Sequence, residues 1–111
     1  MTHILRGAER APGKSRTIRF EGAAYGTGIS FFAVDNAPGE GPDLHTHPYA
    51  ETWIVKRGRA RITAGTETIE AGPNDIVVVP GNTPHMFKNI GEDRLEIFCI
   101  HDAGTMDQTD L

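Results

Sequence analysis

The sequence has little of what marks several large classes of protein. Its 111 residues include one cysteine, Cys99, which cannot form a disulfide within the chain. A secreted fold held together by disulfides is therefore not indicated, and we expect a cytoplasmic protein. Basic residues are also few, with 11 Lys and Arg against 15 Asp and Glu and a formal net charge of −4. This charge does not supply the positive field that general nucleic-acid binding requires.

Long hydrophobic runs are missing as well. The longest aliphatic run, 76–79, is far shorter than the ~20 residues that a membrane helix needs. The first 19 residues are charged and interrupted by glycine and proline, so we expect no signal peptide. We therefore expect a single domain whose partners include neither membrane nor nucleic acid.

Glycine and proline, with 13 and 7 residues, are spread along the whole chain. They divide it into segments of about four to eight residues, which is typical of short antiparallel strands, and we find no helical periodicity. The strands that we expect are 16–20, 27–34, 44–47, 51–56, 59–63, 67–71, 76–79, 85–89 and 95–101. Because exposed strand edges invite aggregation, we expect an all-β barrel or jelly roll.

This pattern also divides the chain into three parts. The barrel is expected over 16–102. An N-terminal extension or edge strand over 1–15 precedes it, and a loose C-terminal tail over 103–111 follows it.

Alternation along the strands predicts which side chains face the interior. Glu51 and Trp53 share one face of their strand, and Cys99 and His101 share one face of theirs, and we expect both faces to point inward. The strand 27–34 is apolar on both faces, so its alternation leaves the inward face open. We place Phe31 on that face.

Three histidines and a glutamate form the most informative pattern. His45 and His47 are two residues apart, which on a strand puts both imidazoles on one face, about 6.6 Å apart at the backbone. Glu51 follows shortly afterwards, and His85 lies in a distant segment. Such a set of imidazoles with one carboxylate suits Fe, Mn, Ni, Cu, Co or Zn.

The residues around these four resemble the two sequence motifs of the cupin family. The first motif combines His-x-His and a glutamate with two glycines at fixed spacings, matched here by Gly39, His45, His47, Glu51 and Gly58. The second motif is matched by Pro80, His85 and Asn89, while two of its glycines are replaced by Asn74 and Asn82. Asparagine tolerates the left-handed backbone region better than most residues, so we expect both turns to survive.

The resemblance implies a double-stranded β-helix, or jelly-roll barrel, around one divalent transition metal ion. It implies the metal ligands His45, His47, Glu51 and His85. It also implies a homodimer, formed through an outer sheet face or by exchange of an N-terminal strand, here 16–20. Cupins include dioxygenases, isomerases, decarboxylases, storage proteins and sensors, so the fold does not name the reaction.

We expect a metalloenzyme that acts on a small organic molecule, with dioxygenase chemistry favoured narrowly over isomerase or lyase chemistry. The candidate catalytic residues are His101 and Tyr49, and the candidate pocket residues are Trp53, Phe87, Cys99 and Phe31. Core packing is the alternative for the aromatic residues and for the cysteine, and a surface position at a strand end is the alternative for His101. There are two alternative functions. The protein could be a non-catalytic binding or sensing module, or a barrel in which the metal only stabilises the fold.

Overall fold

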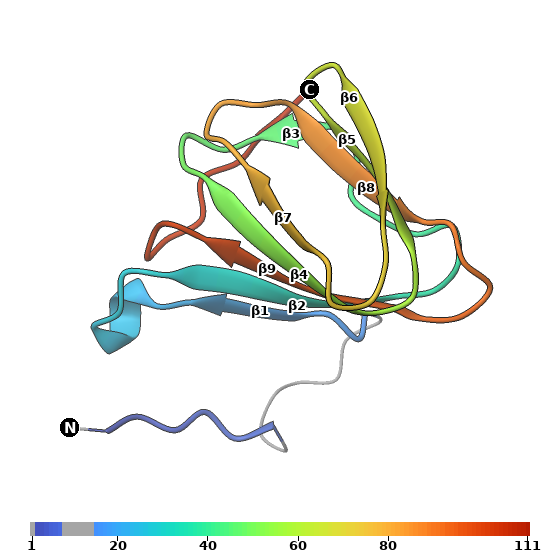
Figure 1. Ribbon diagram of the computed structural model, residues 1–111. Coiled ribbons are helices and arrows are strands. Elements are labelled where there is room, and N and C mark those ends of the chain that lie inside the picture. Colours follow the sequence, from blue (N-terminus) through green and yellow to red (C-terminus); the bar gives the residue numbers. More distant parts are fainter. Residues whose placement is uncertain (1, 8–14) are drawn as a thin grey trace.

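The computed structural model describes residues 2–7 and 15–111. The chain forms two five-stranded antiparallel sheets that pack face to face as a jelly roll (Figure 1). Sheet A contains, in spatial order, β1 (Ile18–Glu21), β2 (Ser30–Asn36), β9 (Leu95–His101), β4 (Glu51–Arg57) and β7 (Ile76–Val79). Sheet B contains β10 (Thr109–Asp110), β3 (His45–Thr46), β8 (His85–Asn89), β5 (Ala60–Ala64) and β6 (Glu67–Ala71). The predicted all-β jelly roll is confirmed.

Regular structure outside the two sheets is short. One 3-10 turn, η2 (Ala23–Tyr25), joins β1 to β2. Within the described ranges, no helix is long and apolar enough to cross a membrane. Each of the nine strands expected from the sequence has a counterpart, with ends that differ by up to three residues.

The interior is built by the alternation of side chains along β4 and β9. Val55, Leu95 and Ile97 are at most 1% exposed and form the apolar core together with Ala60 and Ile62 of β5. The same inward faces carry Glu51 and His101 at their other ends, also buried. The inward direction predicted for both faces is therefore correct. On each strand, the inward face carries apolar core residues at one end and a buried polar residue at the other.

Two turns confirm the interpretation of the asparagines in the second motif. Asn74 has φ 70° and Asn82 has φ 59°, and they are the non-glycine residues with positive φ in the described part of the chain. Gly58 of the first motif has φ 87°, and a Cβ there would lie 2.5 Å from the carbonyl oxygen of Arg94. Asparagine thus adopts the left-handed backbone that both turns require, while at position 58 the close approach of the backbone also requires glycine.

The placement of Phe31 on the inward face is wrong. The inward residues of β2 are Ser30, Phe32 and Val34, of which Phe32 and Val34 line the internal cavity. Phe31 packs on the outside of sheet A against Phe20, with ring centroids 5.0 Å apart. Because both faces of this strand are apolar, its pairing with β9 decides the direction, and the sequence pattern does not.

The C-terminal segment is not a loose tail. Its strand β10 pairs with β3, with Thr109 opposite Thr46 and Asp110 opposite His45. The backbone N–H of Met106 donates to Glu21, 3.0 Å away. A two-residue polar strand has too little hydrophobic pattern to be recognised in a sequence, although its backbone pairing orders the segment.

Candidate metal centre

Strand register brings the four implied ligands together from both sheets. His45 of β3 lies directly opposite His85 of β8 in sheet B. Glu51 at the start of β4 lies opposite His101 of β9 in sheet A. His47 follows β3 immediately, in the turn that leads to β4. The inner faces of the two sheets therefore present these side chains to one another at the same end of the barrel.

The side chains converge on the carboxylate of Glu51. Nε2 of His47 lies 3.2 Å from its Oε1, and Nε2 of His85 lies 3.1 Å from its Oε2. The ring of His45 packs against that of His85, with centroids 4.3 Å apart. Ligand atoms of the three histidines lie within 4.8 Å of one another. All four side chains, at most 6% exposed, are buried.

Backbone carbonyl groups fix the tautomer of each of the three imidazoles. Nδ1 of His45 lies 2.6 Å from the carbonyl oxygen of Asp43, and Nδ1 of His85 lies 2.8 Å from that of Thr83. Nδ1 of His47 lies 2.8 Å from the carbonyl oxygen of Asp107. A carbonyl oxygen can only accept, so Nδ1 carries the hydrogen in each case, and Nε2 keeps a free lone pair. Metal-binding histidines are oriented in this way.

The electrostatics keep the carboxylate ionised. Burial alone would raise the pKa of Glu51, but contacts with His101, His47 and His85 outweigh it and lower the pKa far below the usual range. Burial lowers the pKa of His45, which favours the neutral, ligating form. Burial also acts to lower the pKa of His47, but its contacts with Glu51 and with the Asp107 carbonyl raise that pKa overall. The cluster thus offers one anionic carboxylate beside several imidazole nitrogens.

Several buried nitrogens in this cluster lack a well-aligned hydrogen-bond partner. They are the Nε2 atoms of His47, His85 and His101. A buried polar atom without a partner is costly, and a cation shared among nitrogen and carboxylate ligands would satisfy the lone pairs of His47 and His85. The donor set is borderline in softness and fits a divalent transition metal.

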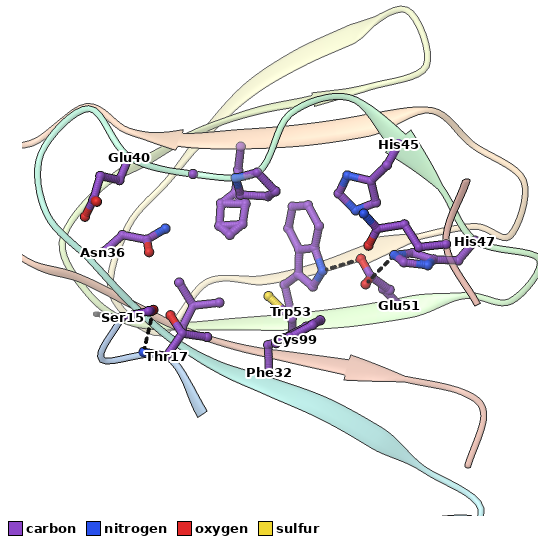
Figure 2. A pocket seen from close by; sticks show the side chains of 15 residues that line it. Ser15, Thr17, Phe32, Asn36, Glu40, His45, His47, Glu51, Trp53 and Cys99 are labelled. Atoms are coloured by element: carbon purple, nitrogen blue, oxygen red, sulfur yellow. Dashed lines mark hydrogen bonds and ion pairs between the residues drawn. The ribbon is translucent and has the colours of Figure 1, made fainter. Parts of the chain in front are cut away.

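A cavity of about 540 Å³ opens beside the cluster. Figure 2 shows His45, His47 and Glu51 at one end, and Asn36, Glu40, Ser15 and Thr17 at the other. The wall between them is largely apolar and includes Phe32, Val34, Pro42, Trp53, Phe87 and Cys99. The indole N–H of Trp53 donates to Oε2 of Glu51 over 2.8 Å, so one wall residue also holds the carboxylate.

The predicted pocket residues are found in different places. Trp53, Phe87 and Cys99 line the cavity, while Phe31 lies outside it. Tyr49 and His101 do not line the cavity either and lie behind Glu51. Sequence reasoning missed Phe32, Val34 and the polar residues at the far end, because their inward direction depends on strand register and loop path.

The matching segment and the geometry together identify the family. A family profile described as "Cupin domain" matches residues 32–101, which hold all four converging side chains. The chain belongs to the cupin family. The four implied motif residues of this cupin fall in two overlapping groups that could hold a metal ion, one of His45, His47 and His85 and one of His47, Glu51 and His101.

The cupin domain is similar to proteins of different kinds. An uncharacterised protein of Streptomyces coelicolor, SCO3923, is 31% identical over 78% of this chain and 79% of its own. The mannose-1-phosphate guanylyltransferase ManC of Salmonella typhimurium is 29% identical over 67% of this chain. The match covers only 16% of that enzyme's length.

The fold also matches solved cupin structures. A Bacillus subtilis oxalate decarboxylase with Mn(II) centres superposes with a TM-score of 0.82 and 23% identity. The match covers 94% of this chain and 30% of the decarboxylase. At this identity, the likeness establishes the fold and leaves the reaction open.

Proposed function

We propose that this cupin is a metalloenzyme that binds one divalent transition metal ion through His45, His47, Glu51 and His85. The observation that carries the proposal is the common construction of the three imidazoles. Each has Nδ1 tied to a backbone carbonyl. The three rings lie together beside one ionised carboxylate, and His45, His47 and Glu51 line the end of a cavity. An ordinary polar cluster has no need for this shared orientation.

The cavity favours a small organic substrate with an apolar body. Its wall is formed largely by aromatic and aliphatic side chains, whereas the far end offers amide, hydroxyl and carboxylate groups. Among the described residues, no Lys or Arg lines it, and Glu40 adds a negative charge. This lining supports a neutral substrate over a phosphorylated one, because a phosphate is usually bound by cationic or backbone N–H groups.

We further propose dioxygenase chemistry, favoured narrowly over isomerase or lyase chemistry. Four protein ligands leave about two positions of an octahedron for substrate oxygens or O₂. A metal ion in this site would supply Lewis acidity, or activation of O₂ in the case of iron or copper. The chain's own contribution is to fix the ligands, exclude water with the apolar wall and bind the substrate's body.

A non-catalytic binding or sensing module is the second candidate. One observation favours it: apart from the proposed ligands, the titratable groups that line the cavity are Cys99, whose pKa is raised, and Glu40 at the far end. The raised pKa of Cys99 keeps it a thiol, and Glu40 lies at the end of the cavity away from the proposed ligands (Figure 2). An enzyme of this design would have to rely on the metal and the substrate for proton transfer.

The test combines metal analysis with turnover. Protein loaded separately with Fe, Mn, Ni, Cu, Co or Zn is expected to keep about one ion per chain after dialysis. It is then assayed for O₂ uptake with diketones, catechols and thiols. The Glu51→Gln variant should bind metal at least ten- to hundredfold more weakly, a range seen even for supporting residues. Glu40→Gln, at the other end of the cavity, is the control and should retain the ion.

Three outcomes distinguish the enzyme from the binding module and test the metal site itself. Metal retention with turnover supports the enzyme. Tight ligand binding without turnover under every metal supports the binding module. Absence of metal retention in the unaltered protein contradicts the metal site itself.

A further inference from the structure

A fourth histidine, His101, reaches the same carboxylate as the proposed ligands. It lies on β9 directly opposite Glu51, is 1% exposed, and its Nε2 lies 2.5 Å from Oε1 of Glu51. By position alone it could be a further metal ligand, since its nitrogen also lies within 4.8 Å of ligand atoms of His47 and Glu51. The hydrogen bonds on the outer side of its ring decide between the two roles.

The outer nitrogen of His101 faces a hydroxyl group instead of a carbonyl. Its Nδ1 lies 2.6 Å from Oη of Tyr49. A hydroxyl can donate as well as accept, so this contact does not by itself place the hydrogen on Nδ1. His101 therefore differs from the three other imidazoles of the cluster, whose outer partners can only accept.

The other contacts of Tyr49 determine the direction of its hydrogen bond. Asp107 donates its backbone N–H to Oη over 3.2 Å, so it cannot accept the phenol hydrogen. Nδ1 of His47, 3.3 Å away, already carries a hydrogen that is directed to the Asp107 carbonyl. Among the described residues, Nδ1 of His101 is thus the remaining acceptor for the Tyr49 hydroxyl. A neutral imidazole that accepts at Nδ1 carries its own hydrogen on Nε2.

That assignment places an N–H group against the carboxylate. Trp53 already donates to Oε2 of Glu51, and the Nε2–H of His101 faces Oε1. Nε2 of His101 lies 2.5 Å from the carboxylate, closer than the 3.1 and 3.2 Å of His85 and His47, although none of the three contacts is aligned as a hydrogen bond. Two atoms bound to one ion at about 2.1 Å and at right angles lie about 3.0 Å apart. The two longer distances suit neighbouring ligands of one ion, and the contact with His101 is too short for that arrangement.

We propose that His101 is a positioning residue that holds Glu51 for metal binding, with its tautomer set by Tyr49, and that it is not a metal ligand. This inference rests on the proposed function, in which Glu51 is a ligand. It assigns the ion three imidazoles and one carboxylate, so that about two octahedral positions stay open. A fourth imidazole would leave about one, too few for a chelating substrate.

The direct test is the tautomer of each ring in the zinc-loaded protein. Long-range proton–nitrogen NMR distinguishes hydrogens on Nδ1 from those on Nε2, and the chain has only 5 histidines to assign. We expect the Nδ1–H form for His45, His47 and His85 and the Nε2–H form for His101. An Nδ1–H form of His101 with a zinc-shifted Nε2 would make it a ligand and overturn the proposal.

Two substitutions test the consequence for metal affinity. His101→Gln keeps an N–H donor near the Nε2 position and should retain most of the manganese affinity. His101→Leu removes the donor and should weaken manganese binding about ten- to hundredfold, the usual cost of losing a supporting group. Equal losses in both variants would point to a ligand, and no loss in either would show that His101 is idle.

A conservative variant covers the case in which His101→Leu does not fold. Tyr49→Phe removes only the hydroxyl. We expect part of the Nε2–H signal of His101 to be lost, and manganese affinity to fall less than in His101→Leu. An unchanged tautomer in this variant contradicts the role of Tyr49. If the unaltered protein retains no metal, the proposed function fails and this proposal fails with it. Retention with an idle His101 defeats this proposal alone.

Discussion

At the scale of single residues, Cys99 shows how the cavity changes the chemistry of a side chain. It lies between Phe32 of β2 and Trp53 of β4 in the strand register and is 4% exposed. Burial first, and the nearby Glu51 carboxylate second, raise the pKa of its thiol well above the usual value. Because the thiolate is the nucleophile, a thiol with a raised pKa is unreactive at neutral pH.

We predict that iodoacetamide modifies Cys99 at least about tenfold more slowly in the native protein at pH 7.5 than in urea, since each pKa unit changes the thiolate fraction about tenfold. The native rate should still increase above pH 9, where the rate in urea has levelled off. The chain has one cysteine, so intact-mass spectrometry follows the reaction without ambiguity. Equal rates at neutral pH would mean that the thiol is exposed or ionised.

Whether a side chain faces inward or outward could be predicted from the sequence where a strand alternates clearly between polar and apolar positions. The inward faces of β4 and β9 follow from such alternation and include Glu51, Trp53 and Cys99. The direction of Phe31 was not predictable, because both faces of its strand carry apolar residues, such as Ala33 on one and Val34 on the other. The tautomers of the histidines could not be predicted from the sequence either, because they depend on carbonyl groups such as that of Asp107, which is 60 residues from His47.

At the scale of elements, the C-terminal segment supports the candidate metal cluster. Asp107 accepts from Nδ1 of His47 through its carbonyl and donates to Tyr49 through its N–H. Both interactions use the backbone, and the pairing of β10 with β3 holds the segment in place. The sequence suggested a tail here because charged and small residues show no periodicity, and backbone contacts leave no pattern in side chains.

Removal of residues 107–111 should therefore weaken metal binding about tenfold or more, since His47 loses the acceptor that orients it. Asp107→Ala is the matched control, because it keeps both backbone groups and removes only the side chain. Its metal affinity, measured by competition with a chelator, should stay within about twofold of the unaltered protein. Equal weakening in the two variants would assign the effect to the Asp107 carboxylate and contradict the role of the backbone.

At the scale of the whole molecule, the two sheets have very different outer faces. The outer face of sheet A carries Thr52 near its middle and Asp35 and Glu96 at one end. All five strands also carry apolar residues on this face: Ile18, Phe20, Phe31, Ala33, Phe98, Ile100, Ile54, Ile76 and Val78. Five strands at about 4.8 Å make this face about 24 Å wide. The outer face of sheet B carries polar residues such as Arg61, Thr63 and Glu70. An apolar patch of this width marks an interaction surface.

A second copy of the chain is the occupant that we propose for the outer face of sheet A. A two-fold axis through the face would place apolar strand on apolar strand, as an isologous interface requires. Ile76, Val78 and Phe98 are 66%, 64% and 43% exposed, so each gains burial on dimerisation. β1 pairs with β2 of its own chain, and exchange of this strand between chains remains a prediction.

Light scattering after size exclusion should give twice the chain's mass for the unaltered protein. Phe98→Lys should convert it to monomer, because a buried unpaired charge at the centre of an apolar interface costs several kcal/mol. Thr63→Lys places the same charge on the polar face of sheet B and should leave the dimer intact. Because Phe98 points away from the cavity, the monomeric variant should still retain its metal. A monomeric mass for the unaltered protein contradicts the proposed interface, and dissociation by Thr63→Lys moves the interface to sheet B.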